Sequence, residues 1–164
     1  RKMRQTAAAD IATIGRISAV PAILQVIREL TGLRSAAVAR VTEDSWTACA
    51  VLDQLNFGLQ VGGELDLVTT LCHEIRQAHH SVVIDKASDH HTPRLYQFES
   101  YISVPIFRTD GRFFGTICAL DPNPAPLKSS TIQSTMESFA RMLALQNRLI
   151  ALLPEATPPV SPMM

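Results

Sequence analysis

Two runs of β-branched and aromatic residues, at positions 100–107 and 113–121, constrain the fold of this chain most. A short connection that contains Asp110 and Gly111 joins them, and this arrangement predicts a β-hairpin. Few polar side chains interrupt either run, so both strands are expected to lie inside a sheet that is covered on both faces. Pro105 cannot donate a hydrogen bond to a neighbouring strand, which predicts a bulge or an open strand edge at that point.

The hairpin also resembles the central signature of GAF domains, the small-ligand sensory modules of signalling proteins. The resemblance rests on Ser-Tyr-Ile-Ser-Val-Pro-Ile-Phe at 100–107, on Gly-Arg-Phe-Phe-Gly-Thr-Ile-Cys-Ala-Leu-Asp-Pro at 111–122, and on Val-Val-Ile-Asp at 82–85. It spans about residues 18–150. It implies an α+β fold in which an antiparallel sheet carries the N- and C-terminal helices on one face and ligand-side loops and a helix on the other.

Composition excludes several classes of protein. Lysine plus arginine and aspartate plus glutamate number 15 each, so no long-range field attracts the chain to nucleic acid or to an anionic membrane. The apolar runs are shorter than the roughly 18 residues of a membrane span. Three cysteines without a CxxC pair favour a reducing cytoplasm over a disulfide framework. With 164 residues beginning at Arg1, we expect one domain excised from a longer protein.

Helix signals are clearest near the N-terminus. Ile11 and Ile14 share a face of an alanine-rich segment, and a second helix is expected with Ser18 as N-cap, Pro21 in its first turn and Gly32 at its end. The expected elements are, in order, a helix at 4–14, a helix between Ser18 and Gly32, strands at 36–41 and 46–52, an irregular segment at 54–65, a helix at 66–79 capped by Asp66, a strand at 82–84, a loop at 85–97, the hairpin, and a helix from 129 or 130 to 153. We assign 1–17 to an N-terminal linker helix, 18–153 to the GAF domain and 154–164 to a proline-rich linker.

The terminal helix carries two apolar stripes. One repeats at heptad spacing through Ile132, Met136, Phe139, Leu143, Gln146, Ile150 and Leu153, and Met142, Leu145, Leu149 and Leu152 widen it. One stripe is enough to cover the sheet, and a second apolar patch left in water usually marks an interface. We therefore expect a parallel homodimer through the terminal helices, which the resemblance places side by side. The expected interface residues are Ile11, Ile14, Phe139, Leu145, Leu149, Ile150 and Leu153.

Cys72-His73 is the most suggestive chemical pair, because a thiolate beside an imidazole suggests a nucleophile, a haem ligand or a bilin attachment point. Adjacent residues of a helix point about 100° apart, however, and do not readily share one ligand. In phytochrome-like GAF domains the bilin-bearing Cys-His pair precedes the strand matched here at 101–107, and residues 94–99 contain no cysteine. The pairs His79-His80 and His90-His91 lack a carboxylate pattern typical of a metal site. We therefore expect no bilin, haem or metal.

A ligand, if there is one, is expected on the sheet face opposite the terminal helices, under the loop at 85–98. The residues expected to line its pocket are Cys72, His90, Tyr96, Phe98, Tyr101 and Cys118. Cys49 and Cys118 lie in apolar strand-like runs and are expected to be buried, unreactive thiols.

The function expected from the resemblance is a cytoplasmic sensory and dimerisation module without catalysis of its own. Such modules precede histidine kinases, diguanylate cyclases or transcription activators, and we expect a two-component sensor histidine kinase with phosphorelay output. Two alternatives stay open. One is a structural spacer that binds no ligand, and the other is a thiol-based enzyme that reduces free methionine sulfoxide.

Overall fold

The computed structural model describes residues 2–42, 45–55, 60–66, 80–89 and 98–152. The chain folds into the α+β architecture that the sequence predicts. Its elements are the helices α1 (Lys2–Gly15), α2 (Val20–Thr31) and α4 (Ser130–Leu152), the 3-10 helix η2 (Ala87–Asp89), and the strands β1 (Ser35–Val41), β2 (Ser45–Asp53), β3 (Glu64–Asp66), β4 (Val82–Ile84), β5 (Ser100–Phe107) and β6 (Phe113–Asp121).

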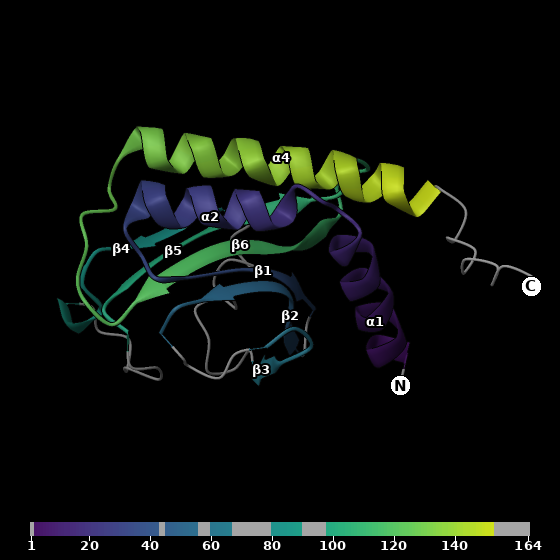
Figure 1. The fold of residues 1–164 in the computed structure, drawn as a ribbon, viewed down its shortest axis with the longest axis horizontal. Helices are drawn as coiled ribbons and strands as arrows, with labels where there is room; N and C mark the ends of the chain where they lie inside the picture. The colour runs from purple at the N-terminus through teal and green to yellow at the C-terminus, as the bar shows by residue number, and fades with distance from the viewer. Residues whose placement is uncertain (1, 43–44, 56–59, 67–79, 90–97, 153–164) are drawn as a thin grey trace, which may run out of the picture.

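The strands form one six-stranded antiparallel sheet in the order β3-β2-β1-β6-β5-β4 (Figure 1). β1 and β6 lie at its centre and pair from Ser35↔Leu120 to Arg40↔Gly115. This ladder joins the strands of the N-terminal half to the β5–β6 hairpin and β4. The sheet therefore depends on a contact between two segments that are far apart in the sequence.

The predicted hairpin is confirmed, and so is the open edge at Pro105. Pro105 pairs with Thr116 of β6 on one side. On the other side β4 pairs with β5 only from Tyr101 to Ser103, so within the described residues no strand needs a donor from Pro105. The register shifts just beyond it, between Ile106 and Phe107.

A bulge in β2 changes which side chains face the helices. Val38 of β1 pairs with Ala50 and Ala39 pairs with Ala48, so Cys49 is the extra residue of β2. Cys49 and the next residue, Ala50, consequently both face the helix side of the sheet, whereas Ala48 and Val51 face the other side. Simple alternation along the run at 46–52 does not predict this change of phase.

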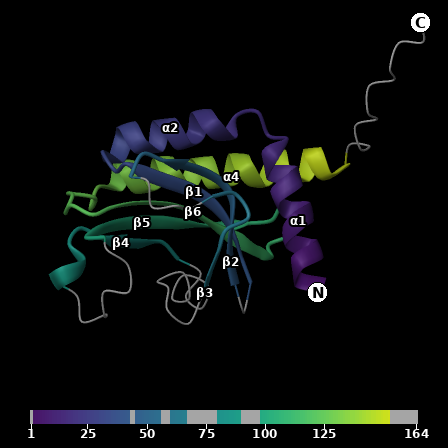
Figure 2. The same cartoon turned by 60° about the horizontal axis from the view of Figure 1, so that its bottom comes forward.

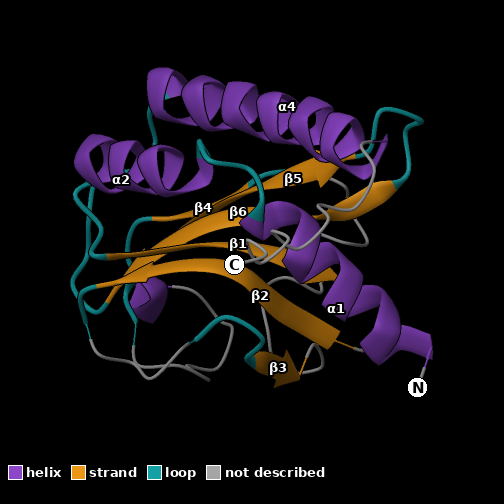
Figure 3. Ribbon diagram, turned by 45° about the vertical axis from the view of Figure 1, so that its right-hand side comes forward, coloured by secondary structure: helices purple, strands orange, loops and turns teal. Residues whose placement is uncertain are grey.

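Helices α2 and α4 lie side by side on one face of the sheet, and α1 crosses beside its end (Figures 1 and 3). The main core lies between these helices and the sheet. Its fully buried large side chains include Ile14, Leu24, Ile27, Leu33, Ile102, Phe114, Ile117, Leu127, Met136 and Leu143. No single described helix is long and apolar enough to cross a membrane, and Ala8–Gly15 meets that test only jointly with α2, across an 83° bend.

The predicted ends of α2 are partly confirmed. Pro21 lies in the first turn, and Gly32 ends the helix with a φ of 75° and donates its N–H to Arg28 O. The prediction of Ser18 as N-cap is wrong, because the N-cap is Ala19, which makes no side-chain capping hydrogen bond. A turn in which Val20 N donates to Ile17 O leads directly into the helix and moves its start past Ser18.

The segment predicted as irregular at 54–65 ends in a strand, because Glu64–Asp66 pairs with Ser45–Thr47 as β3. Three residues at a sheet edge are too few to show a periodic pattern, which explains the miss. Asp66 is thus the last residue of β3. The helix predicted after it, the loop at 90–97 and Leu153 lie outside the described residues.

The start of β1 is tied to the end of β6 by Arg34 and Asp121, which lie 87 residues apart. Arg34 Nε and Nη2 donate to the two carboxylate oxygens of Asp121 at 2.8 and 3.0 Å, and Arg34 N donates at 3.1 Å. Burial opposes ionisation of Asp121, but these bonds and one from Asn123 N outweigh it and hold the pKa of the carboxyl below its ordinary value.

The central ladder leaves no room for a side chain at Gly115. A Cβ at this position would overlap Ala39 O and crowd Val41 N, both backbone atoms of β1. Neither can move without displacing the ladder, so only glycine fits at this position.

We predict that Gly115→Ala destabilises the domain by about 1–3 kcal/mol or more, because overpacking against backbone cannot relax through a rotamer change. The matched control is Gly15→Ala, since a Cβ at Gly15 in α1 meets nothing within 4 Å. That variant should be neutral or slightly more stable. Urea unfolding of both variants measures the difference, and equal midpoints would contradict the proposed crowding.

Candidate functional site

The sheet face turned away from the helices carries a second, smaller apolar cluster, which we call the distal face. Its middle consists of small side chains and its ends of aromatic ones. The buried residues of the distal face are Ala37, Ala39, Val41, Trp46, Ala48, Ile84, Phe98, Tyr101 and Cys118. None of these residues is charged, so the described part of this face suits an uncharged ligand.

The distal face holds three of the six residues predicted to line a pocket. Tyr101 in β5 and Phe98 before it place their rings 5.6 Å apart, and Cys118 lies on the adjacent strand β6. Tyr101 and Cys118 both interact with other groups of the protein. Cys72, His90 and Tyr96 lie outside the described residues.

Among the described residues on this side of the sheet, two buried polar atoms have no hydrogen-bond partner. They are Ser103 Oγ, in a residue that is 0% exposed, and Trp46 Nε1, in a residue that is 3% exposed. Ser103 pairs with Cys118 and Val82 and shares their face of the sheet. Buried hydroxyl and N–H groups are nearly always paired, so each of these atoms marks a place where a polar group of a ligand or a water can bind.

One small molecule cannot reach both atoms. Trp46 lies on β2 and Ser103 on β5, with β1 and β6 between them. Three strand spacings separate them by about 14 Å even without any offset along the strands. Ser103 lies beside Tyr101 and Cys118 and therefore belongs to the predicted site, whereas Trp46 does not.

Sequence reasoning missed Ser103, although the signal was present. In a strand, alternate residues share a face, and Tyr101 predicts that Ser103 lies on the same side. That its hydroxyl is buried and unpaired follows only from the three-dimensional structure.

The two described cysteines lie on opposite faces of the sheet. Cys49 belongs to the core under the helices, and Cys118 to the distal face. Both are buried, and burial raises the pKa of the Cys49 thiol to about 12. These two thiols therefore cannot act as a redox pair on a shared substrate.

The described residues contain no group of three histidine, cysteine, aspartate or glutamate residues that could hold a metal ion. His80 is exposed, and its Nδ1 lies 3.0 Å from Ser81 O. The other members of the predicted histidine pairs, His79, His90 and His91, lie outside the described residues.

A backbone frame fixes the end of the sheet beside the distal face. Leu127 N donates to the carboxylate of Asp85, and Ala125 N donates to Asp85 O, so the proline-rich segment after β6 follows the end of β4 (Figure 2). Ser88 N donates to the carboxylate of Glu99, which holds η2 against the start of β5. Residues on both sides of the 90–97 segment are thereby positioned.

The two apolar stripes of α4 have different surroundings. Met136 and Leu143 are buried against the sheet, and Ile132, Phe139 and Ile150 pack partly buried against the same core. Met142, Leu145 and Leu149 are 49%, 57% and 58% exposed, and we call them the outer stripe. From the N-terminal helix, Ile14 is buried at 2% exposure and Ile11 packs against the core.

Comparisons with known proteins agree with this fold. The GAF domain of a phosphoenolpyruvate-protein phosphotransferase from Acinetobacter has a TM-score of 0.67 at 16% identity, over 91% of this chain and 95% of that one. The GAF-B domain of DevS from Mycobacterium smegmatis has a TM-score of 0.64 at 15% identity, over 86% of this chain and 95% of that one. A type II free methionine-R-sulfoxide reductase from Thermoplasma acidophilum has a TM-score of 0.64 at 17% identity, over 81% of this chain and 92% of that one.

At such identities these similarities show the fold alone. A comparison with curated proteins finds no match. The model of the GAF domain family, however, matches residues 16–146 of the 164 in the sequence. The chain therefore belongs to the GAF domain family.

Proposed function

We propose that this GAF domain is a sensory and dimerisation module of a larger cytoplasmic signalling protein and has no catalytic activity of its own. It passes ligand binding or dimer geometry through its terminal helices to a covalently linked output domain, for which a two-component histidine kinase is the expected type. In this proposal residues 1–17 form a linker helix, 18–153 the sensory domain and 154–164 the linker to the next segment.

One observation carries the proposal, which is the outer stripe of α4. Its three large apolar side chains are about half exposed, and they recur at spacings of 3 and 4 residues on the side of the helix opposite the core. Such spacing is typical of a helix that packs against a second helix. A second copy of the same helix supplies an identical stripe, which favours a symmetric dimer.

The position of the exposed apolar residues, near the C-terminal end of α4, further favours a parallel arrangement in which the C-terminal ends of the two α4 helices meet. The exposed apolar residues begin at Met142, and the earlier outward positions Thr131 and Ser134 are small and polar. Contact is therefore expected mainly over the last turns. Among the predicted interface residues that the structure describes, Leu145 and Leu149 are the exposed ones, and Ile14 is buried in the core.

The ligand half of the proposal rests on the unpaired hydroxyl of Ser103. A face closed completely by apolar side chains would gain from alanine at this position, because a buried hydroxyl without a partner is destabilising. The polar group beside Tyr101 and Cys118 therefore favours a ligand-binding domain over a structural spacer. The expected ligand is small, uncharged and mostly apolar, with one group that hydrogen-bonds to Ser103.

We predict that native mass spectrometry of the protein purified from its own host detects a bound small molecule. Ser103→Ala should weaken the affinity for that molecule about fivefold, the value of one hydrogen bond. Ser134→Ala, which removes an exposed hydroxyl of α4, serves as the control and should leave affinity unchanged. A protein that stays unliganded after incubation with a host metabolite extract supports the spacer instead.

We predict a dimer at tens of micromolar, equivalent to an association free energy of about −6 kcal/mol. Leu145→Glu with Leu149→Glu should give monomers with an unchanged far-ultraviolet spectrum, because these side chains lie outside the core and four charges would meet in the interface. Asn123→Glu with Pro126→Glu adds the same charge at exposed positions before α4 and should remain dimeric. Sedimentation velocity compares them, and a monomeric wild type overturns the dimer.

The thiols provide a test of the enzyme alternative. Replacing Cys72 by serine leaves Cys49 and Cys118 as the remaining thiols of the three. At about pH 8, near the ordinary thiol pKa, a chromogenic disulfide reagent should react with them only after urea unfolding, because both are buried and the raised pKa of Cys49 keeps it protonated. Rapid reaction of the folded variant would support accessible, catalytically competent thiols.

A further inference from the structure

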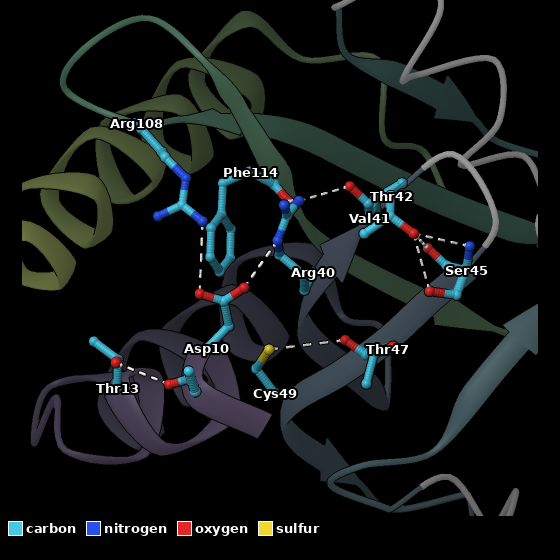
Figure 4. Close-up of polar contacts among 11 residues, drawn as sticks. Asp10, Thr13, Arg40, Val41, Thr42, Ser45, Thr47, Cys49, Arg108 and Phe114 are labelled. Carbon is cyan, nitrogen blue, oxygen red and sulfur yellow. Dashed lines mark hydrogen bonds and ion pairs between the residues drawn. The ribbon is translucent and has the colours of Figure 1, made fainter. Parts of the chain in front are cut away.

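A partly buried charge cluster lies where α1 meets the end of the sheet (Figure 4). Asp10 of α1 accepts a hydrogen bond from Arg40 Nε of β1 at 2.9 Å, and its other carboxylate oxygen lies 3.5 Å from Nη2 of Arg108 in the β5–β6 loop. Both guanidinium groups lie over the ring of Phe114, at 5.3 and 5.0 Å from its centre. One carboxylate thus faces two cations.

The two arginines differ in how fully their donors are used. Arg40 donates to Asp10, to Val41 O at 2.8 Å and to Phe114 O at 2.6 Å. Arg108 has only the longer ion pair with Asp10 and, among the described residues, donates no side-chain hydrogen bond. Its side chain is only 25% exposed. Several of the five N–H donors of its guanidinium group are therefore shielded from solvent and have no hydrogen-bond acceptor among the described residues.

Beside Arg108 there is a small cavity with one unpaired acceptor. Its lining residues come from α1, β5, β6, the β5–β6 loop and α4, and they are Ile14, Ile106, Arg108, Phe114, Leu143, Ala144 and Asn147. The cavity volume is about 10 Å³, close to the room needed for one water molecule. Asn147 of α4 is 9% exposed, and its Oδ1 is buried with no hydrogen-bond partner in the described part of the chain.

We propose that one water molecule binds in this cavity, accepts a hydrogen bond from Arg108 and donates one to Asn147 Oδ1. Water is the ligand that fits both groups, because it is donor and acceptor at once. An anion would be repelled by the amide oxygen and a cation by the guanidinium, and larger molecules exceed the cavity. The first and last helices of the domain are then connected in one chain, from Asp10 through Arg108 and the water to Asn147.

This connection lies on the helix side of the sheet and is independent of any ligand on the distal face. A direct bond on the outside accompanies it, in which Arg148 Nη1 donates to Thr109 Oγ1 at 2.9 Å. The tight loop between β5 and β6 is closed by a hydrogen bond from Arg108 N to Arg112 O, and Gly111 in this loop adopts a φ of 90°. Arg108 is therefore a positioning residue that holds α1 and α4 in a fixed relation through a short, constrained loop.

A double-mutant cycle with Asn147→Leu and Arg108→Met tests the bridge by urea unfolding. With the water present, Asn147→Leu should raise the unfolding equilibrium constant about fivefold, the value of one buried hydrogen bond, and less than about twofold when Arg108 is already methionine. Gln146→Leu, an exposed neighbour on α4, controls for helix propensity. If Asn147→Leu leaves stability unchanged or raises it, the acceptor was unpaired and the proposal fails.

Hydrogen exchange tests whether Asn147 acts on α1. If Asn147 stabilised only its own surroundings in α4, its substitution would not change the exchange rates of α1. Asn147→Leu should speed amide exchange at residues 8–15 of α1 more than Ile132→Val, a small core truncation near the start of α4. Equal effects of the two variants on α1 would overturn the coupling. A crystal structure of the wild type settles the water directly, since it must lie within hydrogen-bond distance of Asn147 Oδ1 and Arg108, and an empty cavity overturns the proposal.

Discussion

The close pairing of β1 with β6 at Gly115 is the contact on which the rest of the sheet depends. β1 carries β2 and β3 on one side, and β6 carries β5 and β4 on the other. Without this ladder the two halves would be separate three-stranded sheets, and β1 and β6 would each become an edge strand with unpaired backbone groups. The Arg34–Asp121 contact closes the same ladder at its far end across 87 residues. Because the pKa of Asp121 lies below its ordinary value, the stability from this contact is present above the ordinary carboxyl pKa and is lost as the pH falls through the lowered one.

Much of this fold could be predicted from the sequence because its signals are local. The Asp110-Gly111 connection between two apolar runs predicts the hairpin, Gly32 predicts the end of α2, and the heptad spacing near the C-terminus predicts α4. The failures have physical reasons. Ser18 is a good capping residue at a position where turns already lead into the helix, and β3 is a strand only because Ser45–Thr47 lies beside it.

The candidate site likewise combines features that the sequence predicts with features that it does not. Tyr101 and Cys118 lie on the distal face because alternation along a strand places them there, and periodicity is readable in a sequence. Asp10 lies 30 residues from Arg40 and almost a hundred from Arg108 in an alanine-rich helix, where a lone carboxylate is usually solvated. The bulge at Cys49 likewise requires knowledge of the partner strand, because it is defined by the register of Val38 and Ala39.

The last turns of α4 carry both Asn147 and the outer stripe. Asn147 faces the charge cluster, whereas Leu145 and Leu149, on the turns around it, point to the opposite side of the helix. An α-helix transmits rotation over two turns with little internal change, since its backbone hydrogen bonds fix the angle of 100° between successive residues. A displacement of Arg108 or α1 that changes the contact at Asn147 would therefore turn the outer stripe as well. In the proposed dimer the helix itself would be the coupling element, and the two helix ends would change their relation without a rearrangement of the sheet.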